Sequence, residues 1–222
     1  MGDSALTTDH EAFLAEIERM RQDLMRQAAV AVGDYFRRSP TRESVREWLT
    51  TRCWREMEYV LLISEILLKY RTEFDAKLIA SLCKQLWEEA KHHRDLGACV
   101  ERLGGTIPKA VTPPDVPWSR VLWEGTTRDK VCAVAGWYMS ESSGSATMRI
   151  VVDGMRANGY PDVAKVYEYI DEEETFHVHL GRAILERYAT TPEARGHALW
   201  AADEIRKIMT KSWAQLFAMV GA

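Results

Sequence analysis

The sequence of 222 residues lacks several features that would define a class of function. It has four cysteines, and no two of them form a C-x-x-C pair. We therefore expect free thiols in a reducing compartment, and we exclude an attached zinc or rubredoxin-type iron site. No apolar run approaches the roughly 18 residues of a membrane span, so we expect no transmembrane helix.

Positive charge is not in excess either. There are 29 Lys and Arg residues against 33 Asp and Glu residues, a formal net charge of -4, so a nucleic-acid partner is not expected. The stretch from Met1 to Leu6 has no charged segment followed by an apolar one, and we therefore expect no signal peptide and a cytoplasmic location.

What the sequence does have is helical periodicity almost throughout, and no segment shows the sustained alternation of a strand. Residues 106–128 contain several prolines and are predicted to form a long irregular connection. The sequence thus predicts a single all-α domain over 1–222. Its core is two helical hairpins joined by a crossover between the second and third helices of a four-helix bundle, with extra terminal helices. The predicted helices are 9–38, 41–70, 74–103, 129–157, 161–188 and 191–220.

One ligand pattern occurs twice, as a lone Glu followed by an E-x-x-H motif: Glu58 with Glu89 and His92, and Glu141 with Glu174 and His177. The lone Glu precedes the motif Glu by 31 residues in the first copy and by 33 in the second. A single E-x-x-H motif would mean little, because chance supplies one readily. Two copies with matching upstream acids favour a common site.

Metal is the simplest explanation of these acids. Residues three apart share a helix face, so a Glu and a His at this spacing can point to one spot in the bundle core. Each lone Glu and each motif interrupts an otherwise apolar face, and buried carboxylates without partners are very costly. Two divalent cations would neutralise four carboxylates and leave both imidazoles neutral as ligands.

Neighbouring acids leave alternatives open. Glu56 competes with Glu58 for the first lone position but lies off the apolar stripe predicted for helix 41–70. That stripe consists of Trp54, Glu58, Leu61, Leu62 and Glu65, and Glu65 is too near the turn to be the ligand. Glu65 is interpreted either as an extra carboxylate in the cavity or as a solvated side chain. Glu88 and Glu173 directly precede the motif acids, and we propose them as acceptors for the second ring nitrogen of each His. The alternative is that both are simple exposed acids.

This arrangement over 41–188 resembles the ferritin-like di-iron carboxylate superfamily. The resemblance implies two ions, Fe/Fe or Mn/Fe, at which O2 reacts. It also implies a ligand set for each iron: Glu58, Glu89 and His92 for one, and Glu141, Glu174 and His177 for the other. Ser145, one turn after Glu141, corresponds to a Thr thought to assist O2 handling in multicomponent monooxygenases, and is the candidate catalytic residue. The alternative for this small-residue run is close helix packing.

At three positions the sequence departs from the pattern of an individual family within this superfamily, which makes each of those families a poorer match. Ala90 stands where bacterioferritins have a haem-ligating Met, Leu96 where the radical subunit of ribonucleotide reductase has a Tyr, and Ile170 where arylamine N-oxygenases have a third His.

The resemblance favours an oxygenase or oxidase of the monooxygenase type acting on a small organic substrate, with an external electron donor. The alternatives are a ferroxidase, peroxidase or iron-handling protein, and a bundle that uses metal only for structure. The terminal helices could cover the bundle, form the face of a homodimer or bind a reductase.

Overall fold

The computed structural model describes residues 3–108 and 116–219, with side chains described for 9–108 and 116–212. The described chain is all-helical and contains no strand, which confirms the predicted all-α class. Its helices are α1 (Asp3–Arg37), α2 (Arg42–Tyr70), α3 (Ala76–Arg102), α4 (Pro117–Arg128), α5 (Lys130–Ser145), α6 (Met148–Ala157), α7 (Pro161–Tyr188) and α8 (Pro192–Met219).

Helix starts follow the capping residues in the sequence. The Thr41 hydroxyl accepts a hydrogen bond from the backbone N–H of Ser44, and the Asp75 carboxylate accepts one from Leu78. Such side chains satisfy the N–H groups that a helix leaves unpaired in its first turn. Pro161 and Pro192 open α7 and α8 at the first helical position, where a missing N–H costs nothing.

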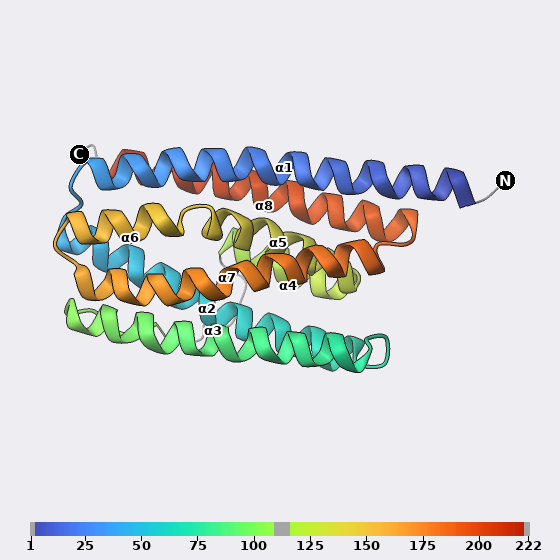
Figure 1. Ribbon diagram of the computed structural model, residues 1–222, viewed down its shortest axis with the longest axis horizontal. Helices are drawn as coiled ribbons and strands as arrows, with labels where there is room; N and C mark the ends of the chain where they lie inside the picture. The colour runs from blue at the N-terminus through green and yellow to red at the C-terminus, as the bar shows by residue number, and fades with distance from the viewer. Residues whose placement is uncertain (1–2, 109–115, 220–222) are drawn as a thin grey trace.

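The helices run roughly along one direction in layers (Figure 1). The pair α1 and α8 lies along one side and the pair α2 and α3 along the opposite side, with α5, α6 and α7 between them. The closest packing joins α2 to α3, α5 to α7 and α8, α6 to α7, and α1 to α8. Both predicted hairpins are therefore present, and α3 and α7 bring them into contact.

Three predictions about the elements were wrong. The first helix begins at Asp3 rather than at residue 9. The connection 106–128 is not irregular throughout, because its second half forms α4, which packs on α5, α8 and α2. Its residues 109–115 lie outside the described part, as does residue 220 of the last predicted helix.

The third error concerns helix 129–157, which is broken into α5 and α6. The break follows small residues, and the Thr147 hydroxyl donates to the Gly144 carbonyl at 2.8 Å. Side-chain hydrogen bonds of this kind compete with the regular helical ladder.

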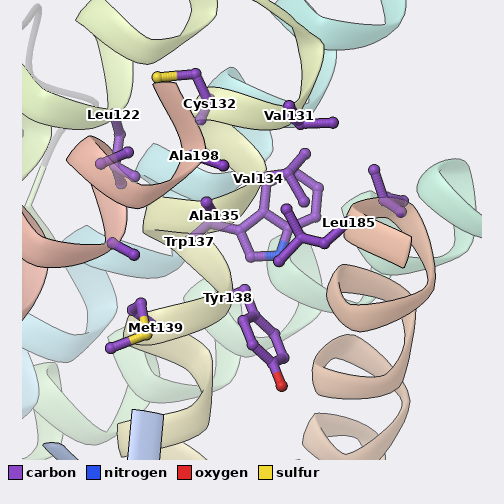
Figure 2. Close-up of a cluster of buried hydrophobic side chains, with 14 of the residues drawn as sticks. Leu122, Val131, Cys132, Val134, Ala135, Trp137, Tyr138, Met139, Leu185 and Ala198 are labelled. Atoms are coloured by element: carbon purple, nitrogen blue, oxygen red, sulfur yellow. The ribbon is translucent and has the colours of Figure 1, made fainter. Parts of the chain in front are cut away.

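Buried apolar residues form two core clusters at opposite ends of the helices. The first core cluster includes Ile63, Leu82, Trp137 and Ile184. The second includes Leu49, Leu96, Val152 and Ile170. In the first core cluster, side chains of α5 gather with others from α4, α7 and α8, labelled Leu122, Leu185 and Ala198 in Figure 2.

A polar layer separates the two core clusters. Along α3, Leu82 belongs to the first and Leu96 to the second, and Glu89 and His92 lie between them. The same order holds along α2, α5–α6 and α7, so four helical segments each contribute acids or imidazoles at one depth of the bundle. We call the set the carboxylate–histidine layer, and its members are Glu56, Glu89, His92, Glu141, Glu174 and His177.

No helix within the described ranges is long and apolar enough to cross a membrane.

Candidate metal centre

The carboxylate–histidine layer contains two groups of potential ligands. Glu56, His92 and Glu174 make up one, and Glu89, Glu141 and His177 the other. Within each group the three ligand atoms lie within 4.8 Å of one another, and every member is buried. Five of the six predicted ligands are thus brought together, while the sixth position is taken by Glu56 instead of Glu58.

The motif acids Glu89 and Glu174 each belong to one group but also lie close to the other. The two carboxylate oxygens of Glu89 face both imidazoles, at 3.6 Å from Nδ1 of His92 and 3.2 Å from Nδ1 of His177. Glu174 is grouped with His92 but also lies 3.8 Å from Nδ1 of His177. Each motif acid can therefore reach both positions, which suits a pair of ions that share carboxylates.

Most of the oxygen and nitrogen atoms that the layer directs inward, and that could bind a metal, have no hydrogen-bond partner among the described residues. A buried polar atom without a partner costs about 1–3 kcal/mol, and more if it is charged. So many of them in one place need a common partner. The atoms are Oε1 and Oε2 of Glu56, Oε2 of Glu89, Nδ1 of His92, Oε1 of Glu141, both carboxylate oxygens of Glu174, and Nδ1 of His177.

The outer nitrogen of each imidazole is held by an acid from the other motif. Nε2 of His92 donates to Glu173 at 2.8 Å, and Nε2 of His177 donates to Glu88 at 3.2 Å. An ionised carboxylate can only accept, so these contacts place the proton on Nε2 and leave Nδ1 as the lone-pair atom facing the layer. Glu88 and Glu173 thus make the contacts expected of them, in a crossed pairing.

A lysine bonds to each of these two acids. Lys84 bonds to Glu88 and Lys91 to Glu173. Burial raises the pKa of Glu88, but the hydrogen bonds from His177 and Lys84 outweigh it and lower that pKa to about 2. An ionised Glu88 orients the imidazole and makes its free nitrogen a stronger donor to a metal.

Within the layer, proximity of the acids disfavours ionisation. Burial, with the neighbouring Glu89 charge, raises the pKa of Glu141 to about 8. The pKa values of Glu89 and Glu174 are also raised well above the usual range, first by burial and then by other carboxylates, although His177 opposes the rise. Divalent cations would remove this penalty because they replace protons as the counter-charge.

Arg52 supplies the one positive side chain in contact with the layer among the described residues. Its Nη2 lies 3.1 Å from Oε1 of Glu56 and 3.7 Å from Oε1 of Glu174. Burial opposes ionisation of Glu56, but Arg52, helped by both imidazoles, outweighs it and lowers the pKa of Glu56. Sequence reasoning missed Arg52, although its position four residues before Glu56 places it on the same helix face.

Glu58 lies on a different face of α2. Its Oε2 accepts hydrogen bonds from the Ser119 hydroxyl at 2.6 Å and the Trp123 indole at 3.2 Å, both on α4. The predicted stripe through Trp54 and Glu58 therefore faces α4, and the stripe that meets the bundle centre runs through Leu49, Cys53, Glu56 and Ile63. Because α2 is buried on both sides, apolar residues do not mark a single face.

One signal in the sequence could have found Glu56. It precedes Glu89 by 33 residues, the same spacing as Glu141 to Glu174, whereas Glu58 breaks the repeat. Glu65 is half-buried near the end of α2 and belongs to neither ligand group.

Small polar residues adjoin Glu141. Ser145 is half-buried in the last turn of α5. Ser142 is fully buried, and its hydroxyl has no hydrogen-bond partner in the part of the chain that the structure describes. Gln85, also missed by sequence reasoning, donates from Nε2 to Oε1 of Glu89 at 3.1 Å and so orients that acid.

The residues present fit divalent metal ions. Four carboxylates and two imidazoles with free Nδ1 atoms are the donor types that iron and manganese take in proteins, and they converge in a buried space. No protein-family model matches the chain, and no curated protein matches it either.

Proposed function

We propose that this protein is an O2-dependent oxygenase or oxidase with two metal ions, Fe/Fe or Mn/Fe, in a ferritin-like bundle. It would act on a small organic substrate and take electrons from an external donor. In this proposal α2 with α3 and α5–α6 with α7 are the two hairpins of the bundle. Bound metal would supply the reaction with O2.

A single observation carries the proposal: most of the inward-facing ligand atoms of the carboxylate–histidine layer are buried and, apart from the ion pairs with Arg52 and the contacts among the layer's own members, have no hydrogen-bond partner among the described residues. A purely structural polar layer would satisfy its groups internally, because each unsatisfied atom lowers stability. The crossed contacts from Glu88 and Glu173 add support, since ligating imidazoles commonly donate their second N–H to a carboxylate.

The chain's own residues would hold the site in a fixed geometry. Glu173 and Glu88 fix the imidazole rings, and Gln85 fixes Glu89. The core clusters on either side exclude bulk water from the layer. Rigid support of this kind keeps the ligands placed when the metals change charge.

The test begins with anaerobic titration of Fe(II) into the metal-free protein. We expect two equivalents to bind, followed by O2 consumption that continues only while a reductant is supplied. Retention of less than one equivalent of Fe(II), or no reaction with O2, would refute the proposal. Continued turnover of added Fe(II) into a ferric mineral would replace it with iron storage.

A further inference from the structure

A cavity of about 370 Å³ lies next to the carboxylate–histidine layer. It is formed by the first half of α2 and the second half of α8, and its wall includes Trp48, Thr51, Arg52, Arg55 and Met209. Small-molecule sites in proteins begin at about this size. Since Arg52 also contacts Glu56 and Glu174, it stands between the cavity and the layer.

Two guanidinium groups share this wall. Arg52 and Arg55 are three residues apart, so they lie on one face of α2. The side chain of Arg52 is only 15% exposed, and Nε of both arginines is buried without a hydrogen-bond partner among the described residues. Arg55 stacks over the Trp118 ring, 5.2 Å from its centroid, and forms no ion pair with any described residue.

The charges do not balance once metal is bound. Two divalent ions would neutralise the four carboxylates of the layer, and Arg52 would then lose the charge of Glu56 that offsets it in the metal-free protein. Two adjacent half-buried cations repel each other and favour an anion between them. Glu43 and Glu47 also line the cavity, but both are exposed, so water and salt screen their charges, and Glu43 is paired with Arg46.

The other side chains of the cavity wall indicate what kind of anion would fit. The Trp48 indole and the Met209 thioether provide apolar and polarisable wall. Thr41, Ser44 and Thr51 place hydroxyl-bearing side chains around the same cavity. An anion with an apolar body suits this combination better than a sugar or a nucleotide, because the apolar wall would desolvate their polar groups without replacing the lost hydrogen bonds.

We propose that the cavity binds a small carboxylic acid, with its carboxylate held by Arg55 and Arg52 and its apolar body against Trp48 and Met209. This inference rests on the proposed function, for which it names the substrate class. The planar guanidinium fork matches a carboxylate and can bind it through two parallel hydrogen bonds. The carboxylate end would lie nearest to the metal ligands.

Calorimetric titration of the Mn(II)-loaded protein with 3-phenylpropanoate tests the proposal, with 3-phenylpropanamide as the uncharged match. We expect the acid to bind at least about 10-fold more tightly than the amide, because it alone forms charge-assisted hydrogen bonds. Equal binding of acid and amide, or no binding of either, would overturn the proposal. We also expect weaker binding of the acid to metal-free protein, where Glu56 still offsets the charge of Arg52.

Three variants distinguish the effect of the Arg55 charge on acid binding from a general effect of substitution on the fold. In Arg55→Met the acid should lose its advantage over the amide, whereas in Arg149→Met, the matched loss of an exposed guanidinium on α6 outside the cavity lining, that advantage should remain. Thr51→Trp places bulk in the cavity from an exposed position on α2 and should abolish binding of both probes while thermal unfolding stays unchanged. Persistence of the acid preference in Arg55→Met would contradict the role given to this residue.

The two proposals fail in different ways. If the protein retains no Mn(II) or Fe(II), the metal centre is refuted before the acid is added. If metal binds and O2 is consumed but the acid does not bind better than the amide, the metal centre stands and the substrate class is wrong.

Discussion

Which acid of α2 belongs to the proposed metal centre is the point at which sequence pattern and structure differ most, and a pair of isosteric substitutions decides it. Glu56→Gln and Glu58→Gln each replace a carboxyl group by an amide without changing side-chain volume. Both acids are buried, two residues apart on one helix. A general effect of removing a buried carboxyl group would therefore appear in both variants, whereas a ligand effect would appear in one.

The structure predicts a large difference between them. Glu56 offers a carboxylate oxygen within 4.8 Å of the ligand atoms of His92 and Glu174, so its loss removes one of three ligands from a metal position. Partners outside the ligand set are already worth 10- to 100-fold in metal affinity, so loss of a ligand should cost about 100-fold, or roughly 2.7 kcal/mol. The amide of Glu58→Gln can still accept from Ser119 and Trp123, so its metal affinity should stay within about threefold of the wild type.

Competition with a chromophoric chelator under anaerobic conditions measures these affinities for Fe(II) and Mn(II). Circular dichroism of both metal-free variants provides the control for folding. Loss of metal by Glu58→Gln with retention by Glu56→Gln would refute the assignment of the α2 ligand. Equal loss in both would indicate that buried charge, rather than coordination, controls the site.

Further predictions concern an acid that bonds to an imidazole, the pH dependence of stability, and helix packing. Glu173→Gln should weaken metal binding about 10- to 100-fold, because His92 loses its carboxylate acceptor, and unchanged affinity in the same chelator assay would contradict that role. In the metal-free protein, Glu141 has a pKa of about 8 when folded, above the ordinary value of 4.5, so it holds a proton that the unfolded chain releases. Its contribution to stability is therefore present at low pH and is lost as the pH rises to about 8, at up to about 1.4 kcal/mol per pH unit. Metal replaces that proton, so the difference in Tm between metal-loaded and metal-free protein should widen from pH 5 to pH 8, and a constant difference would argue against it. Gly154→Ala should destabilise the fold by about 1–3 kcal/mol in urea unfolding, since the new Cβ would lie 2.2 Å from Cγ of Phe36. Gly196→Ala, which meets nothing within 4 Å, should be neutral or stabilising, and similar losses in both would refute the packing argument.

Much of the fold follows from local sequence signals. Capping residues such as Thr41, Asp75 and Asp129 define where helices start, because their side chains satisfy backbone N–H groups of the first turn. The missed helix α4 lacks such a signal. The residue before it, Val116, makes no side-chain cap, and α4 is stabilised instead by burying Trp118 and Leu122 against neighbouring helices.

The candidate metal centre also has a part that local sequence predicts and a part that depends on tertiary packing. The two E-x-x-H motifs are local, since the i,i+3 geometry of a helix places each Glu beside its His whatever surrounds them. The partners of the motifs are not local. Glu173 meets His92, and Glu88 meets His177, only because α3 and α7 pack side by side.

The sequence by itself determined that the chain is helical, where most helices begin, and which acids and imidazoles form motifs. Tertiary structure decided which face of α2 meets the centre of the bundle. A helix buried on two sides carries no amphipathic signal, so α4 had to be in place before Glu58 could be assigned to it and Glu56 to the carboxylate–histidine layer. Tertiary structure also brought Arg52 and Arg55 to the cavity beside that layer, because Met209 and Ser212 of α8 supply its opposite wall.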